Sequence, residues 1–264
     1  MRRVCFVLGI LAVPIAASLG SAHDLKVLAS RWAFDAKGGK STIYLSWGHH
    51  LPVDDLVDAA AIERYDLLTP DGSAKPLKKT DLSLQTNVVQ LDAEGVHQVI
   101  VCRKVAVFTF VVDEEGNRVM KRGPKSAVKE GAIDYSLRSQ QFAKALLVAG
   151  TAKKETVKPA GLPLEIVPVE EPAKWCKGDL HFRVLFQGKP LGEEMLTATR
   201  IGFQPADAWC YATSTNHAGE AVVRADQAGI WVLRVHVRKP ARGAAREQYD
   251  YESYTSTLTL EVRP

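Results

Sequence analysis

Hydrophobic and polar residues alternate along much of the chain beyond its first twenty residues, which is the period of a β-strand with one buried face. The stretch Ser41–Trp47 is typical, since it alternates and is rich in β-branched and aromatic residues. Comparable segments occur in both halves of the chain. The predicted strands are Ser41–Trp47, Asn87–Leu91, Val96–Val101, Val105–Val112, Leu180–Phe186, Met195–Thr199, Glu220–Arg224, Ile230–Arg238 and Tyr254–Val262.

Turn signals that contain glycine separate these segments, for example Glu94-Gly95 and Ala228-Gly229. Short strands at regular spacing are typical of β-sandwiches. Two stretches differ: Asp54–Arg64 predicts a helical turn or an extended loop, and Asp134–Val148 has apolar residues at helical spacing. We therefore expect an all-β fold of two tandem immunoglobulin-like or transthyretin-like β-sandwich domains, with a short helical or irregular connector.

A polar, lysine-rich segment followed by prolines predicts the domain boundary near residue 160. We expect an N-terminal β-sandwich domain at residues 23–150, a linker at 151–160 and a C-terminal β-sandwich domain at 161–264. Such sandwiches indicate a fold and leave the function open.

The first 22 residues have the order of a cleavable secretory signal peptide. Arg2 and Arg3 form a basic start, and the apolar run Val4–Leu19 is shorter than the roughly 20 residues of a membrane span. Small residues follow and end at Ala22, after which we expect cleavage. This predicts a periplasmic or equivalent extracytoplasmic location with no membrane span after cleavage; an uncleaved N-terminal anchor is the alternative.

The charge and the motif content exclude several classes of function. The formal net charge of +4 includes both arginines of the signal peptide, and the remaining charge is too weak and too evenly spread to indicate nucleic-acid binding. The chain has no Gly-x-Ser-x-Gly, His-Glu-x-x-His, phosphate-binding glycine loop or dinucleotide fingerprint. We therefore expect a binding protein and no enzymatic activity.

Three cysteines follow the predicted signal peptide: Cys102, Cys176 and Cys210. An oxidising compartment favours a disulfide, and three cysteines allow three single pairings. We favour a bond between Cys176 and Cys210, each beside a tryptophan in the same half of the chain, with Cys102 as a buried thiol.

Several short motifs occur in an order that is similar to a known family. They are the signal peptide followed by His23, then Gly48-His49-His50-Leu51-Pro52, Gly161–Pro168, the run ending at Leu191, Ala228-Gly229-Ile230-Trp231 and Tyr254–Leu260. In these the chain resembles the periplasmic nickel-uptake substrate-specific domain family, which is related to a component of nickel transport complexes. The resemblance implies an extracytoplasmic, β-rich protein linked to transition-metal uptake, with a membrane metal-uptake transporter as a possible partner.

His23 is the first candidate metal ligand, because cleavage after Ala22 makes it the first residue. Its α-amino group, with a pKa near 8, then lies beside an imidazole on the same residue, and both nitrogens can chelate one metal. A second imidazole completes a site suited to Cu(II) or Ni(II), which favour nitrogen ligands in tetragonal geometry. The alternative is an ordinary frayed terminus.

His49 and His50 follow a predicted strand and a glycine, so they lie at a strand end or in a loop. Adjacent strand residues point to opposite faces, so one of the two faces a metal more easily, and the resemblance favours His49. Packing against Trp47 is the alternative. Asp24, Asp54 and Asp55 are further candidates, as oxygen ligands or as groups that orient an imidazole.

His236 lies on the predicted strand Ile230–Arg238, on the face opposite to Trp231. It is either a third ligand or a solvent-facing strand residue. Together these residues predict a binding protein for nickel or cobalt, and in second place copper, that serves metal uptake or buffering. The alternative is a recognition module for carbohydrate or protein with no metal role, whose platform is formed by exposed aromatic residues: Trp32, Trp47, Tyr249, Tyr251 and Tyr254.

Overall fold

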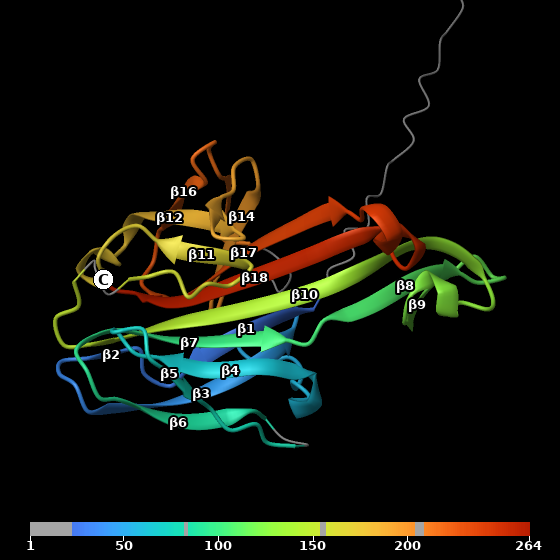
Figure 1. Ribbon diagram of the computed structural model, residues 1–264. Helices are drawn as coiled ribbons and strands as arrows, with labels where there is room; N and C mark the ends of the chain where they lie inside the picture. The colour runs from blue at the N-terminus through green and yellow to red at the C-terminus, as the bar shows by residue number, and fades with distance from the viewer. Residues whose placement is uncertain (1–22, 82–83, 154–156, 204–208) are drawn as a thin grey trace, which may run out of the picture.

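Three β-sheets build the protein in the computed structural model, which describes residues 23–81, 84–153, 157–203 and 209–264 (Figure 1). The predicted signal peptide and part of the predicted linker lie outside these residues. Four short 3-10 helices occur in the described ranges: Ala59–Ala61, Lys125–Ala127, Pro172–Lys174 and Gly243–Glu247. None of the helices in these ranges is long and apolar enough to cross a membrane.

The largest sheet has eleven strands and runs through both halves of the chain. Its main path, in spatial order, is β15 (Tyr211–Ser214), β14 (Met195–Arg200), β17 (Gly229–Pro240), β18 (Tyr251–Val262), β10 (Ala132–Ala149), β7 (Gly95–Arg103), β4 (Ile62–Leu68) and β5 (Ala74–Pro76). Beside this path, β2 (Ala33–Phe34) and β8 (Ala106–Val112) pair with β10, and β9 (Arg118–Arg122) pairs with β8. The first part of β10, with β8 and β9, projects as an arm (Figure 1).

Two smaller sheets pack on this large one and complete two sandwiches. The first contains β1 (Asp24–Ala29), β3 (Gly39–Gly48) and β6 (Thr86–Leu91). The second contains β11 (Leu164–Pro168), β12 (Gly178–Phe186), β13 (Lys189–Pro190) and β16 (Glu220–Ala225). The architecture is all-β with tandem β-sandwiches, and all nine strands predicted from alternation are present.

The prediction of a helix at residues 134–148 is wrong, because these residues form most of strand β10. Phe142 and Leu146 belong to the hydrophobic core of the second sandwich, whereas Ala143, Ala145 and Leu147 belong to that of the first. Successive side chains of a strand point to opposite faces, so β10 is buried on both. A strand buried on both faces is a nearly continuous apolar run, and its period cannot be distinguished from that of a buried helix segment.

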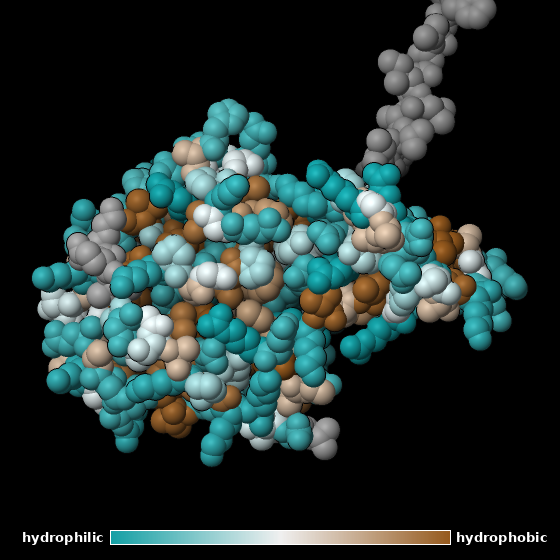
Figure 2. Space-filling view, viewed as in Figure 1, coloured by the Kyte–Doolittle hydropathy of each residue, from teal (hydrophilic) through white to brown (hydrophobic). Residues whose placement is uncertain are grey.

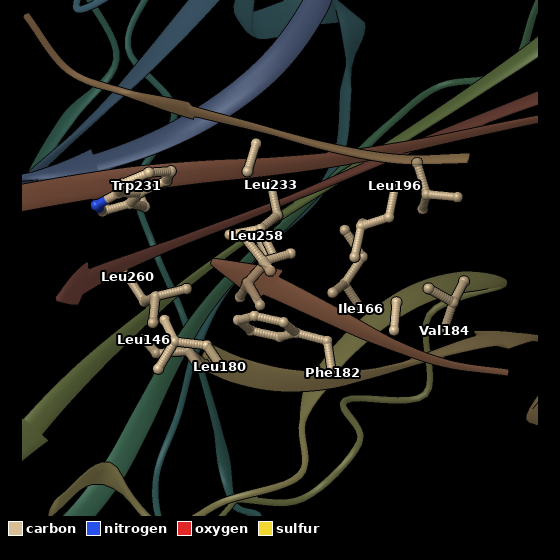
Figure 3. Packing of buried hydrophobic residues seen from close by; sticks show 14 of the residues in the cluster. Leu146, Ile166, Leu180, Phe182, Val184, Leu196, Trp231, Leu233, Leu258 and Leu260 are labelled. Atoms are coloured by element: carbon tan, nitrogen blue, oxygen red, sulfur yellow. The ribbon is translucent and has the colours of Figure 1, made fainter. Parts of the chain in front are cut away.

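The two small sheets therefore lie on opposite faces of the large sheet. Figure 3 shows the core of the second sandwich, where Phe182 of β12 packs with Leu146 of β10 and with side chains of β17 and β18 such as Leu258. In that half, the first small sheet reaches the other face of the large sheet through β1, where Oγ1 of Thr257 on β18 donates to the carbonyl of Leu25. Figure 2 shows that apolar surface gathers on the arm, where Met120 and Ile133 are exposed.

Acid should destabilise the protein through His97 of β7, which is fully buried. Burial lowers the pKa of this imidazole in the folded protein, so the unfolded chain takes up the proton first. Its contribution to stability is therefore present above the usual pKa of about 6.5 and is lost as the pH falls below it.

Urea unfolding between pH 7 and 5 checks this, with the variant His97→Asn beside the wild type. The free energy of unfolding should fall less steeply with decreasing pH in the variant, by up to about 1.4 kcal/mol per pH unit. His217→Asn is the matched control, because that side chain is 93% exposed. Equal slopes for all three proteins would contradict the prediction.

Candidate functional site

The face of the large sheet opposite to the second core is the floor of a cavity of about 1090 Å³. The residues on this floor alternate with those of the second core, as the strand period requires. They come from four neighbouring strands: Thr197 and Thr199 of β14, Val232, Arg234, His236 and Arg238 of β17, Ser253, Thr255 and Thr257 of β18, and Ser139 and Gln141 of β10. The end of the first sandwich, with His23, His49 and His50, forms one side of the cavity.

The rings of His23 and His49 are in contact, with centroids 4.5 Å apart and an interplanar angle of 69°. Strand pairing explains this contact. β1 and β3 are antiparallel with Asp24 opposite Gly48, so His23 and His49 are the next pair beyond the end of that ladder. Trp47 also contacts His23, at 5.6 Å between ring centroids.

Asp54 organises the loop that carries the two neighbouring histidines. Its Oδ2 accepts hydrogen bonds from the backbone N–H of His49 at 2.7 Å and of His50 at 3.2 Å. Its Oδ1 lies 3.2 Å from Nδ1 of His50. The bond from His49 is the largest of the effects that lower the pKa of Asp54, to about 2, so the carboxylate is ionised at neutral pH. Asp54 thus holds the backbone of the loop at His49 and His50 and lies against the imidazole of His50.

The same loop depends on Gly48 and on a buried lysine. Gly48 has a φ of 121°, and a Cβ at this position would collide with the Asp54 carboxylate. Nζ of Lys26, on β1, donates to the Gly48 carbonyl at 2.6 Å and to that of Asp24 at 3.3 Å. Desolvation by burial lowers the pKa of Lys26. These contacts hold the loop with His49 against β1 and therefore beside His23.

His236 lies in the same cavity but on β17, with Nδ1 3.0 Å from Oγ1 of Thr255. Burial, together with Arg234 and Arg238, lowers its pKa to about 4, so the imidazole is neutral at neutral pH. Its register partners across the sheet are Thr255 and then Gln141, whose Nε2 donates to the carbonyl of His23 at 2.9 Å.

Two strand spacings, about 10 Å, therefore separate the backbone of His236 from that of Gln141. The side chain of His236 lies on the face opposite to Trp231, as predicted, and that face is the floor of the cavity. The structure thus brings His23 into ring contact with His49, and it places His236 farther away on the same surface.

The fit to a metal depends on the donors that meet at His23. Within the ranges that the structure describes, no group of three or more His, Cys, Asp or Glu side chains is arranged to hold a metal ion. Two imidazoles do meet, those of His23 and His49. A complete set of nitrogen donors therefore needs one that is not a side chain, such as a terminal amine on His23.

Sequence reasoning missed Arg103, at the end of β7. Its guanidinium carbon lies 3.6 Å from the centroid of the Trp47 ring, so it stacks beside the histidines. Nothing in the local pattern indicates this contact, because Arg103 and Trp47 are far apart in the sequence.

The prediction of a disulfide between Cys176 and Cys210 is wrong, since Cys102, Cys176 and Cys210 are all free thiols. The backbone of Cys176 forms an isolated parallel β-bridge with Arg263, near the end of the chain. The sulfur of Cys210 accepts a hydrogen bond from the backbone N–H of Arg200 on β14. Cys102 is half-buried, and desolvation raises the pKa of its thiol to about 11.

The aromatic platform is also not formed as predicted. Trp32 and Tyr254 have exposed fractions of only 5% each, because they pack into the first and the second core, respectively. Trp47, Tyr249 and Tyr251 are half-buried. The five rings therefore do not form one exposed surface.

Comparisons with known proteins give a family and a distant structural likeness. No curated protein matches the chain. Among solved structures, the D0-D1 domain of Intimin is similar, with 12% sequence identity, a TM-score of 0.22, and coverage of 91% of this chain and 98% of that one. The profile of one domain family matches residues 20–239. The chain therefore belongs to the family described as a domain of unknown function, DUF4198.

Proposed function

We propose that this chain is an extracytoplasmic binding protein for a transition metal ion, with His23 and His49 as its principal ligands. The observation that carries the proposal is the contact of these two imidazole rings, 4.5 Å apart between centroids. Nickel or cobalt is the first choice and copper the second. The ion is cargo, taken up or buffered, and a membrane metal-uptake transporter is the proposed partner.

The chemistry of His23 supports the proposal if the chain is processed after Ala22. The new α-amino group and the imidazole of His23 are joined by a few bonds, so both reach one metal ion with little further loss of entropy. The imidazole of His49 supplies a third nitrogen. Three nitrogen donors suit Ni(II) and Cu(II) in tetragonal coordination.

The surroundings of the two histidines support the same assignment. Asp54 accepts a hydrogen bond from the backbone N–H of His49 and so fixes the loop that presents this ligand, while its other oxygen lies 3.2 Å from Nδ1 of the neighbouring His50. His236 is neutral and lines the same cavity, where its imidazole can bind the cargo as it leaves. The metal assignment is preferred to a carbohydrate platform because Trp32 and Tyr254 are buried.

Metal titration by calorimetry tests the proposal. The protein is secreted and processed to begin at His23, and a second form carries one additional alanine before it. Tight binding of nickel, cobalt or copper is expected for the first form. The extended form and His49→Ala should each lose more than the about 10–100-fold in affinity that removal of an outer-shell partner costs.

His217→Ala is the control, because this histidine is 93% exposed and lies near Glu193, away from the cavity. Its affinity should equal that of the wild type. Equal binding by the extended form would show that the terminal amine is not a ligand. Absence of binding by the processed wild-type protein would refute the proposed function.

A further inference from the structure

Two arginines in the cavity have aromatic partners but no carboxylate partner. The guanidinium of Arg103 stacks on Trp47 at 3.6 Å, and that of Arg238 lies 5.5 Å from the ring centroids of both Tyr135 and Tyr251. Two further arginines of the cavity are paired with carboxylates: Arg234 lies 2.7 Å from Asp24, and Arg118 lies 2.6 Å from Asp134. A fifth, Arg200, donates instead to the backbone carbonyl of Ile201 and stacks on no aromatic ring among the described residues. In the described part of the chain, no carboxylate is within ion-pair distance of Arg103 or Arg238.

Stacking leaves the edge of a guanidinium available. An aromatic ring contacts the face of the planar group, whereas the N–H donors lie along its edge. A guanidinium that is held by its face and has no ion-pair partner is prepared to bind a carboxylate with two parallel hydrogen bonds. Nε of Arg103 is buried and has no hydrogen-bond partner among the described residues.

Both arginines border one continuous floor. Arg238 is aligned across the sheet with Ser253, Ser139 and Ala106, on four adjacent strands. Three strand spacings, about 14 Å, separate the ends of this row, and Arg103 lies just before Ala106 in the chain. The floor is therefore long enough for an extended small molecule between the two arginines.

A buried acceptor in the floor also has no partner. Gln141 has an exposed fraction of 7%, and its Nε2 donates to His23, but no donor for its Oε1 is found among the described residues. A buried polar atom without a partner costs free energy unless water or a ligand binds it. Gln141 therefore offers a hydrogen-bond acceptor to a hydroxyl group in the cavity.

The side chains that line the cavity carry a net positive charge. Seven basic side chains and two carboxylates line it, and both of these carboxylates are paired, Asp24 with Arg234 and Glu194 with Lys239. A concave surface of one sign concentrates ligands of the opposite charge. The volume of about 1090 Å³ and apolar walls such as Phe108 favour an organic anion over a small inorganic one.

We propose that this cavity binds an organic anion with two or more carboxylate groups, held by Arg103 at one end and Arg238 at the other. The inference does not depend on the metal site. It adds that such an anion lies beside His23, because Trp47 contacts both Arg103 and His23. One carboxylate of the anion is then in reach of a metal ion held there.

Calorimetric titration with citrate tests the proposal on secreted protein that has been freed of metal on a chelating resin, so that no soluble chelator competes. Citrate should bind the wild-type protein, and the affinity should fall as salt is added. Arg103→Gln and Arg238→Gln should each weaken binding about tenfold or more, because each removes a charged hydrogen-bond donor. Inorganic phosphate should bind more weakly than citrate.

Arg224→Gln is the matched control, because Arg224 is an exposed residue of β16 and does not line the cavity; its affinity for citrate should be unchanged. Because the titration uses protein free of metal, its outcome is separate from that of the metal titration, which tests the metal site. Thermal unfolding of each variant shows that it is folded. Lack of citrate binding by the wild type, phosphate binding as tight as citrate binding, or wild-type affinity in both arginine variants would overturn the proposal.

Discussion

Replacing Lys144 by methionine should lower the free energy of unfolding by about 3–5 kcal/mol, because the substitution leaves a buried carboxylate without its counter-charge. The side chains of Lys144 and Glu165 have exposed fractions of 2% and 1%, and Nζ lies 2.5 Å from Oε1. Desolvation by burial lowers the pKa of Lys144. The Glu165 carboxylate also accepts hydrogen bonds from the backbone N–H groups of Ala160, Gly161 and Leu162.

Urea denaturation of the variants measures this effect. The double variant Lys144→Met/Glu165→Gln should be more stable than Lys144→Met alone, since a neutral amide removes the unpaired charge and keeps an acceptor for the backbone. Lys75→Met is the control, because Lys75 pairs with Asp92 at the surface, where both are about half exposed. It should cost no more than about 1 kcal/mol. A loss as small as this for Lys144→Met would contradict the prediction.

Substitutions in either core should lower one common unfolding transition. Phe182→Ala in the second core should cost about 3–5 kcal/mol and Leu45→Ala in the first about 2–5 kcal/mol, through lost burial and the cavity left behind. Both residues are almost fully buried. The transition is expected to be shared because β10 supplies side chains to both cores and pairs with β18 from Leu137 to Ala145.

Circular dichroism and hydrogen exchange of amides in each half distinguish the outcomes. A single transition that moves to lower urea in both variants is expected, with coincident curves from the two probes. Val222→Ala on β16 is the control, because this side chain is 38% exposed, and its effect should be within about 0.5 kcal/mol. Two separate transitions, each shifted by only one of the core variants, would show that the halves unfold independently.

The sequence singles out several candidate residues of the site but not their arrangement. His23, His49 and Asp54 stand out in the sequence by residue type and by position near turns. The contact between His23 and His49 depends on the register of β1 and β3, which joins positions far apart in the chain. Arg103 and Arg238 gave no signal, because an arginine at a strand end is commonplace until its aromatic neighbour is known.

The sequence by itself determined the strands that have one buried face, because alternation with a period of two is a local property. It also determined that, in the strand Ile230–Arg238, the side chain of His236 lies on the face opposite to that of Trp231. Only the tertiary structure decided that β10 is a strand, since burial on both faces removes the polar positions that would have marked it. Only the tertiary structure placed the two small sheets on opposite faces of the large one, because strand pairing and packing join residues that are distant in the sequence. This arrangement leaves a cavity over one face of the large sheet, beside the histidines.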